Sequence, residues 1–427
     1  MLKKTPLVPF VLVTSLFALW GFANDITNPM VSAFKTVMQM SNFRASLVQA
    51  AFYGGYFTMA LPAALFIRKY SYKSGILVGL ALYAVGALMF YPAAKYEEFN
   101  FFLLSLYILT FGLAFLETTA NPFILSMGEE STATQRLNLA QAFNPVGSLT
   151  GMFVAQQLIL AALDSDDVDA SGNAIFPTLD SAQQAVIRTH DLAIIRDPYV
   201  YLGTFVVLMF VVFLFKKMPE KPRESSSDDL KGSFGRLFKN SNYKFSVVAQ
   251  MFYVAAQIMC WTFIIQYAER LGYSKAESQT FNIIAMVMFL LSRMICTYIL
   301  KFVSGAKLLM LFGIGALFTV SGAILLQNNL GLYCLMGTSF FMSLMFPTIY
   351  GIGLKGLGDD AKIGSAGLVM AIVGGALMPP LQGALIDLGD VGFIKAENFS
   401  FILPLFCFVV VVLFGWKAGK NEKANAA

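Results

Sequence analysis

The sequence predicts an all-α polytopic membrane protein with twelve transmembrane helices in two halves of six. The composition and the spacing of the apolar runs carry this prediction. Of the 427 residues, 57% are hydrophobic and only 13% are charged, whereas soluble domains carry about 25% charged residues. The basic residues flank apolar spans and form no stripe, so the formal net charge of +5 does not indicate nucleic-acid binding.

Apolar runs of about 20 residues, the length that crosses a bilayer, are separated by short polar segments. We predict spans at residues 8–36, 44–67, 74–94, 99–127, 137–163 and 198–215, followed by 244–269, 277–300, 305–326, 330–354, 363–387 and 397–416. Lysine and arginine concentrate in alternate loops, so the positive-inside rule predicts that both termini are cytoplasmic. An even number of spans agrees with that orientation.

Two longer polar segments interrupt this pattern. Residues 164–198 form a predicted loop that starts with several aspartates, on the side opposite the termini. Residues 219–242 form a predicted central cytoplasmic loop between an N-terminal six-helix half, 1–218, and a C-terminal one, 243–427. This arrangement is the layout of the major facilitator transporters, whose halves contain inverted three-helix repeats.

Residue types used in enzymes and metal sites are scarce. The four cysteines all lie inside apolar runs and are interpreted as small core residues. The single histidine, His190, lies in a polar loop, which excludes a cluster of histidines, and we expect no metal site. No nucleophile–base pair and no phosphate-binding loop is visible, so we expect no enzyme activity.

Two acids lie inside predicted spans, where an ionised side chain is expensive and usually functional. Glu117 lies near the middle of the fourth span, with Asn121 one turn later. Asp25 lies in the first span, followed by Asn28. We predict that Glu117 and Asp25 couple transport to protons. The alternative is a pair of structural carboxyl groups, each satisfied by its neighbours.

The fifth span begins with amides at three-residue spacing: Asn138, Gln141 and Asn144. They share roughly one helical face, and amides suit hydroxyl-rich ligands because each offers a donor and an acceptor. The alternative is hydrogen bonding between packed helices, which we favour for Asn138.

The seventh span carries an aromatic and amide stripe at spacings of three and four: Gln250, Tyr253, Gln257 and Trp261. A sugar site needs apolar rings for C–H faces and amides for hydroxyl groups. Core packing is the alternative interpretation. Arg293 in the eighth span is a basic residue near a span interior, and its partner cannot be predicted from the sequence.

Several stretches resemble the bacterial fucose–galactose–glucose:proton symporter family of the major facilitator superfamily. They are Ala51-Phe-Tyr-Gly-Gly-Tyr-Phe57, Leu116-Glu-Thr-Thr-Ala-Asn-Pro-Phe123, Arg136-Leu-Asn-Leu-Ala-Gln141, Phe143-Asn144, Ala249-Gln250, Gln257 and Cys260-Trp261. The resemblance implies that Glu117 exchanges protons and recognises sugar, and that Asn144 contacts sugar with Gln141 one turn before. The family's first-span aspartate falls on Asn28 here, and Asp25, one turn earlier, is the nearest acid.

The expected function is import of a monosaccharide by proton symport with alternating access. The resemblance implies L-fucose or a related hexose such as galactose or glucose, and the sequence does not decide among them. A sodium-coupled hexose importer and an exporter of another small molecule remain alternatives. We expect no cofactor beyond the proton gradient, with sodium possible, and a monomer in the bacterial inner membrane.

Overall fold

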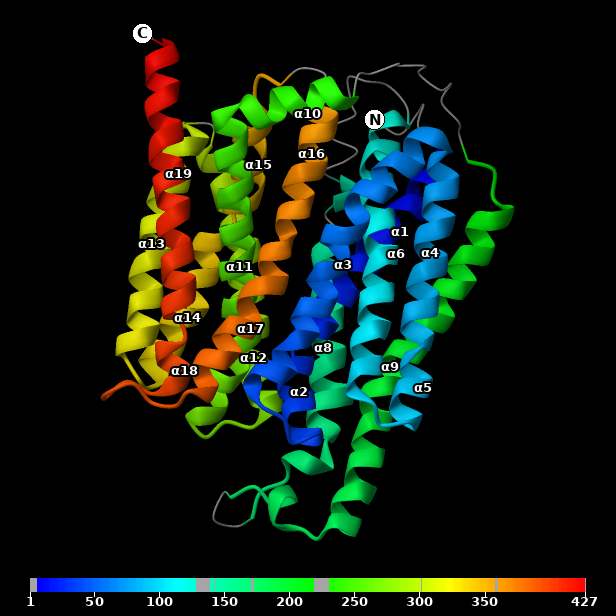
Figure 1. Cartoon of the computed structure of the whole chain (residues 1–427), viewed down its shortest axis with the longest axis vertical. Helices are drawn as coiled ribbons and strands as arrows, with labels where there is room; N and C mark the ends of the chain where they lie inside the picture. Colours follow the sequence, from blue (N-terminus) through cyan, green and yellow to red (C-terminus); the bar gives the residue numbers. More distant parts are fainter. Residues whose placement is uncertain are drawn as a thin grey trace. The chain divides into compact units, whose positions relative to one another are not determined.

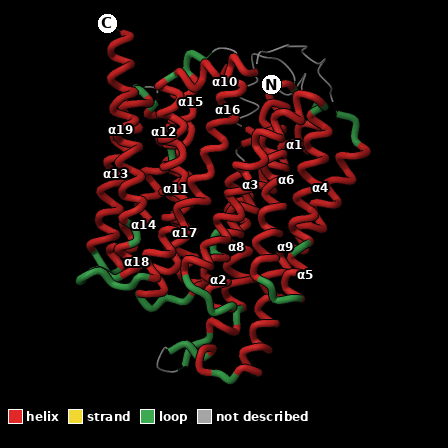
Figure 2. Tube along the Cα trace, viewed as in Figure 1, coloured by secondary structure: helices red, strands yellow, loops and turns green. Residues whose placement is uncertain are grey.

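The computed structural model describes residues 6–127, 139–141, 143–169, 173–218, 230–300, 302–357 and 360–426. In this part of the chain the regular elements are helices (Figure 2), and β-structure is limited to isolated bridges. Among the described residues, twelve helical stretches are long and apolar enough to cross a membrane. The predicted all-α fold with twelve spans is confirmed.

The helices form two compact units. Unit 1 comprises Met1–Met40 and Ala51–Ser225, and unit 2 comprises Ser41–Ala50 and Ser226–Ala427. Sequence order alone placed Ser41–Ala50 in the first half. Helix α3 therefore begins in unit 2 and continues in unit 1.

Unit 1 is built from helices that pack side by side (Figure 1). They are α1 (Leu7–Thr27), α2 (Met30–Val37), most of α3 (Asn42–Lys69), α4 (Tyr72–Leu88), α5 (Phe90–Lys95), α6 (Phe99–Ser126), α8 (Phe143–Val154) and α9 (Ser181–Phe215). Helices α1 and α8 approach closely because Gly147 carries no side chain: a Cβ atom there would lie 1.9 Å from the Ala18 carbonyl oxygen. This contact fixes the amide-bearing face of α8 against α1.

The first predicted span is broken in its interior. Helix α1 ends at Thr27 and α2 begins at Met30, and Pro29 between them has no N–H to continue the hydrogen-bond ladder. The hydroxyl group of Thr27 bonds the Ala23 carbonyl oxygen at 2.8 Å and lies 3.0 Å from the Tyr199 hydroxyl. The break places Asn28 at the C-terminal end of α1, next to Asp25.

The predicted loop over residues 164–198 is wrong in its second part. After the short 3₁₀ turns η5 (Asp164–Asp166) and η6 (Phe176–Thr178), helix α9 begins at Ser181 and runs for 35 residues through Pro198. Asp180 and Gln183 form a capping box at its start, which satisfies N–H groups of the first turn. Hydropathy located only the apolar end of this helix.

Unit 2 has a long central helix, α11 (Ser241–Arg270), which packs against α12, α15, α17 and α19. The other helices of this unit are α10 (Leu230–Lys239), α12 (Lys275–Ile299), α13 (Gly305–Leu325), α14 (Asn329–Met342), α15 (Met345–Leu354), α16 (Ala361–Met370), α17 (Gly374–Asp387), α18 (Ala396–Phe399) and α19 (Ile402–Ala426).

Helix α10 lies within residues 219–242, which the sequence analysis assigned to a loop. Its Leu237 is buried against Tyr243 and Leu368, and the Arg236 guanidinium donates two hydrogen bonds of 2.7 Å to the Asp360 carboxylate. Apolar contacts with Tyr243 and Leu368 and a bidentate ion pair with Asp360 therefore hold this short helix. Of these partners, only Tyr243 is close to the helix in sequence.

The first turn of α3 is capped within unit 2 by Asp387, at the end of α17. The backbone N–H groups of Asn42 and Phe43 donate to the two carboxylate oxygens at 2.9 and 2.7 Å, and the Asn42 side-chain amide donates at 2.8 Å. A carboxylate at a helix N-terminus satisfies free donors and complements the helix dipole. These bonds explain why Ser41–Ala50 belongs with unit 2.

Candidate functional site

The predicted site residues fall into two sets, one in each unit. The unit 1 polar group comprises Asp25, Asn28, Glu117, Gln141 and Asn144. The unit 2 aromatic–amide group comprises Tyr253, Gln257 and Trp261. Asn138 lies outside the described residues.

Asp25 is buried and its carboxyl group is well supplied with donors. Its side chain is 4% exposed, and the Asn28 amide donates to Oδ1 at 3.1 Å. The side chain of Ser148 on α8 hydrogen-bonds the same carboxyl group. Two donors stabilise a carboxylate in a buried position, where it would otherwise be costly.

Glu117 on α6 is in a different environment. It is half-buried, and among the described residues none donates a hydrogen bond to its carboxyl group. Asn121, one turn later, donates instead to the Glu117 backbone carbonyl oxygen at 3.0 Å. Tyr56 on α3 contacts Asn24 of α1 and lies close enough to Glu117 to interact electrostatically.

The amides of the fifth span bond residues of the helices that carry the acids, α6 and α1. Gln141 is exposed and its amide donates to the Asn121 side-chain oxygen at 3.1 Å. Asn144 is half-buried and its amide donates to the Phe17 carbonyl oxygen of α1 at 3.3 Å. The Asn144 side-chain oxygen accepts no hydrogen bond from the described residues, so it is able to accept one from a ligand.

In unit 2, Gln257 is half-buried, whereas Tyr253 and Trp261 are buried. The Tyr253 hydroxyl donates to the Met342 carbonyl oxygen at 3.0 Å and its side chain hydrogen-bonds Gln257. The Trp261 indole N–H donates to the Ser339 hydroxyl at 3.0 Å. The polar atoms of the two aromatic residues therefore bond within the unit, and Gln257 is the most accessible member of this group.

The partner of Arg293 is now visible. Its guanidinium lies 4.7 Å from the centre of the Phe289 ring and donates to the Ser343 carbonyl oxygen at 3.3 Å. Phe289 in turn packs edge-on against Trp261, with ring centres 5.2 Å apart. A cavity of about 360 Å³ beside Arg293 is lined mostly by residues in and next to α12 and α15, with Gly305 of α13, and not by Tyr253, Gln257 or Trp261.

Two residues that interact with the unit 1 polar group, Ser148 and Tyr56, are not among the predicted site residues. Ser148 continues the face of Gln141 and Asn144 at helical spacing, so the amide stripe could have identified it. Tyr56 lies in a stretch that carried the family resemblance, but its contact with Asn24 joins different helices. No local pattern in the sequence marks that contact.

The comparisons with known proteins agree with this architecture. The sequence profile of the Major Facilitator Superfamily matches residues 13–366. An L-fucose-proton symporter from Haemophilus influenzae is 62% identical over 423 residues, which cover 99% of each chain. An L-fucose-proton symporter from Escherichia coli is 34% identical over 96% of this chain and 93% of that protein.

A solved structure supports the same assignment. The crystal structure of the Major Facilitator Superfamily transporter FucP in the outward conformation has 32% sequence identity and a TM-score of 0.71, and the match covers 96% of this chain and 98% of that one. The family resemblance inferred from the sequence is thereby confirmed. The chain belongs to the Major Facilitator Superfamily and, within it, to the family of the L-fucose-proton symporters.

Proposed function

We propose that this protein imports L-fucose, or a closely related hexose, together with protons by alternating access. The relatives that match nearly the whole chain at 62% and 34% identity are L-fucose-proton symporters. The described residues offer a half-buried acid and several amides in helices that are long and apolar enough to cross a membrane. Hydroxyl-rich ligands are recognised by such groups.

One observation carries the assignment of proton coupling. Glu117 and Asp25 both lie in membrane helices, but Asp25 is buried with two donors, whereas the half-buried Glu117 carboxyl group has none among the described residues. Fixed donors stabilise the charged form of a carboxyl group. Without them, its free energy depends more strongly on whether it carries a proton or binds a hydroxyl group of a ligand. Glu117 is therefore the principal coupling residue in this proposal, and Asp25 the second.

The coupling follows from the cost of a charge in a low-dielectric site. When Glu117 is protonated, no net charge has to be buried as the transporter closes around its cargo. A sugar hydroxyl can hydrogen-bond the same carboxyl group, so sugar and proton bias one conformational equilibrium. Conformational change is then favoured with both bound, and the proton gradient drives sugar uptake.

The remaining residues contribute hydrogen bonds and shape. Asn144, Gln141 and Gln257 are the proposed sugar-contacting amides. Asn28 holds the Asp25 carboxyl group. Tyr253 positions Gln257 through their hydrogen bond, and Trp261 supports the same helix through Ser339 and Phe289.

Reconstitution tests this function. Proteoliposomes with an acidic exterior are given a panel of radiolabelled sugars comprising L-fucose, D-galactose, D-glucose and D-xylose, with either sodium or potassium as the salt. We expect accumulation of L-fucose that a protonophore abolishes and that does not change between the salts. Uptake that requires sodium, or a pH gradient without effect on accumulation, would contradict proton symport.

A further prediction concerns Asp25. We expect Asp25→Asn to reduce initial uptake by about three- to tenfold and to remove one titration step from its pH dependence. The reason is that the amide keeps the shape of the carboxyl group but cannot carry a proton. Uptake rates measured from about pH 5 to pH 8 provide the check, and a curve with the wild-type shape would assign Asp25 a purely structural role.

We further propose a monomer in the bacterial inner membrane. Both termini are proposed to lie in the cytoplasm, and the distribution of lysine and arginine between the loops supports this orientation. A fluorescent protein that folds only in the cytoplasm, fused to the C-terminus, reports this orientation. A dark fusion beside a fully active transporter would contradict it.

A further inference from the structure

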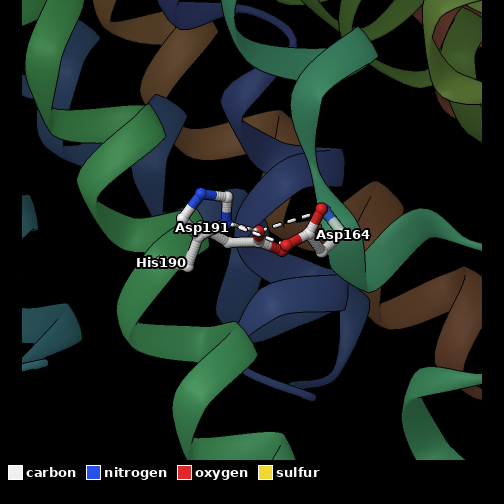
Figure 3. A group of neighbouring side chains, drawn as sticks. All are labelled: Asp164, His190 and Asp191. Carbon is white, nitrogen blue, oxygen red and sulfur yellow. Dashed lines mark hydrogen bonds and ion pairs between the residues drawn. The ribbon is translucent and has the colours of Figure 1, made fainter.

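A cluster of metal-ligating side chains lies outside the transport residues, where the chain passes from the fifth to the sixth membrane helix. The turn η5 contributes Asp164, and the polar start of α9 contributes His190 and Asp191 (Figure 3). The sequence predicts no metal site, because the chain has one histidine. The folded chain brings Asp164, which lies 26 residues before His190, next to that histidine.

The distances resemble those of a coordination shell. The His190 Nδ1 atom lies 2.9 Å from Oδ2 of Asp164 and 3.5 Å from Oδ1 of Asp191, and one ligand atom from each residue lies within 4.8 Å of the others. Ligand atoms around a tetrahedral zinc ion are about 3.3–3.6 Å apart, because each bond is about 2.0–2.2 Å long. Small side-chain shifts would place all three around one ion.

The buried member of the cluster is held rigidly. Asp191 has no exposed surface, and its carboxylate accepts the backbone N–H groups of Asp164 at 3.1 Å and Ser165 at 2.9 Å. Such outer hydrogen bonds orient metal ligands. Ser165, whose backbone N–H bonds Asp191, also has a buried hydroxyl group with no hydrogen-bond partner among the described residues.

We propose that Asp164, His190 and Asp191 bind one divalent transition-metal ion, and that zinc fits best. One imidazole nitrogen and two carboxylate oxygens form a mixed donor set that suits zinc better than calcium or magnesium, which prefer oxygen alone. Asp164 and His190 are about half exposed, so an ion can enter from solvent, and a water molecule completes a fourth position. The ion would join η5 to α9.

The competing interpretation is a simple surface ion pair between His190 and Asp164. That pair requires a protonated imidazole, whereas a metal ion requires its neutral form and two carboxylates. The two interpretations differ in whether added zinc occupies Nδ1. Because His190 is the only histidine in the chain, any imidazole signal from the purified protein reports this site.

The test uses full-length protein in detergent, purified with a histidine-free tag. Zinc chloride is titrated calorimetrically, and diethyl pyrocarbonate modification of His190 is followed by mass spectrometry with and without zinc. We expect one saturable site per chain, at least tenfold protection of His190, and binding that weakens on acidification because protons compete for the ligands.

Variants separate this site from adventitious binding. His190→Gln and Asp164→Asn should each weaken zinc binding by about tenfold or more. Asp167→Asn, which removes an exposed charge from the same segment, should leave it unchanged. Proton-driven L-fucose uptake by His190→Gln shows that the variant is folded. This folding control does not depend on whether the variant binds zinc. Unprotected His190 under saturating zinc, or equal binding by wild type and His190→Gln, would overturn the proposal.

Discussion

Glu117→Gln is expected to abolish concentrative uptake while sparing the exchange of sugar across the membrane. Glutamine resembles the protonated carboxyl group in size and hydrogen bonding, but it cannot release a proton. Under an imposed gradient of about two pH units, a symporter with one proton per sugar can accumulate its substrate about 100-fold, because each unit corresponds to about 1.4 kcal/mol. The variant should reach an accumulation ratio of about one.

The matched control for this prediction is Glu98→Gln. Glu98 precedes the first turn of the same helix α6 and is exposed. Its replacement therefore removes a carboxylate from this helix and leaves the half-buried Glu117 in place. It should accumulate sugar like wild type. Counterflow of radiolabelled L-fucose in Glu117→Gln, within about threefold of wild type, would show that the variant still binds and moves sugar. Full uphill uptake by that variant would remove Glu117 from the coupling mechanism.

Asn144→Ala is expected to raise the apparent KM for L-fucose by about tenfold or more. The Asn144 amide already donates to the Phe17 carbonyl oxygen, and its side-chain oxygen is available to a sugar hydroxyl. Loss of that acceptor leaves a hydroxyl group unpaired in a desolvated site, which costs about 1–3 kcal/mol. Concentration-dependent initial rates in proteoliposomes measure the effect.

The alternative for Asn144 is that it only joins α8 to α1. In that case Asn144→Ala would lower the thermal unfolding temperature and leave the KM unchanged, so the two roles give opposite patterns. Thr150→Ala is the control. Thr150 lies on the same helix and is exposed, and among the described residues its hydroxyl group bonds only the backbone carbonyl oxygen of Val146, one turn earlier.

Most of the fold could be predicted because each membrane helix contains an apolar run long enough to cross a bilayer. The polar first half of α9 could not be predicted from hydropathy, although Asp180 and Gln183, three residues apart, are a recognisable capping box. Helix α10 could not be predicted because Arg236 bonds Asp360, 124 residues later in the chain, and Leu237 packs against the distant Leu368 as well as the nearby Tyr243. The assignment of the first turn of α3 to unit 2 depends on Asp387 in the same way.

The hydrogen-bond partners of Asp25 and Glu117 could not be predicted from the sequence. Asn28 follows Asp25 by three residues and Asn121 follows Glu117 by four, so the two stretches look alike in sequence. In the structure one asparagine donates to the carboxyl group and the other to a backbone carbonyl oxygen. That difference depends on side-chain rotamers and on Ser148, which lies on another helix. The periodicity of residues along one helix contains neither kind of information. The difference separates a carboxyl group with two donors from one that has no donor among the described residues.

The most direct measurement of the central claim counts protons that move with sugar. L-fucose is added to proteoliposomes in a lightly buffered medium without a pH gradient. The external pH and the entry of radiolabelled sugar are then followed together. We expect the medium to become more alkaline, by about one proton per sugar with wild-type protein, and sugar to enter without a pH change with Glu117→Gln. Alkalinisation at the wild-type ratio in that variant would show that another group carries the proton.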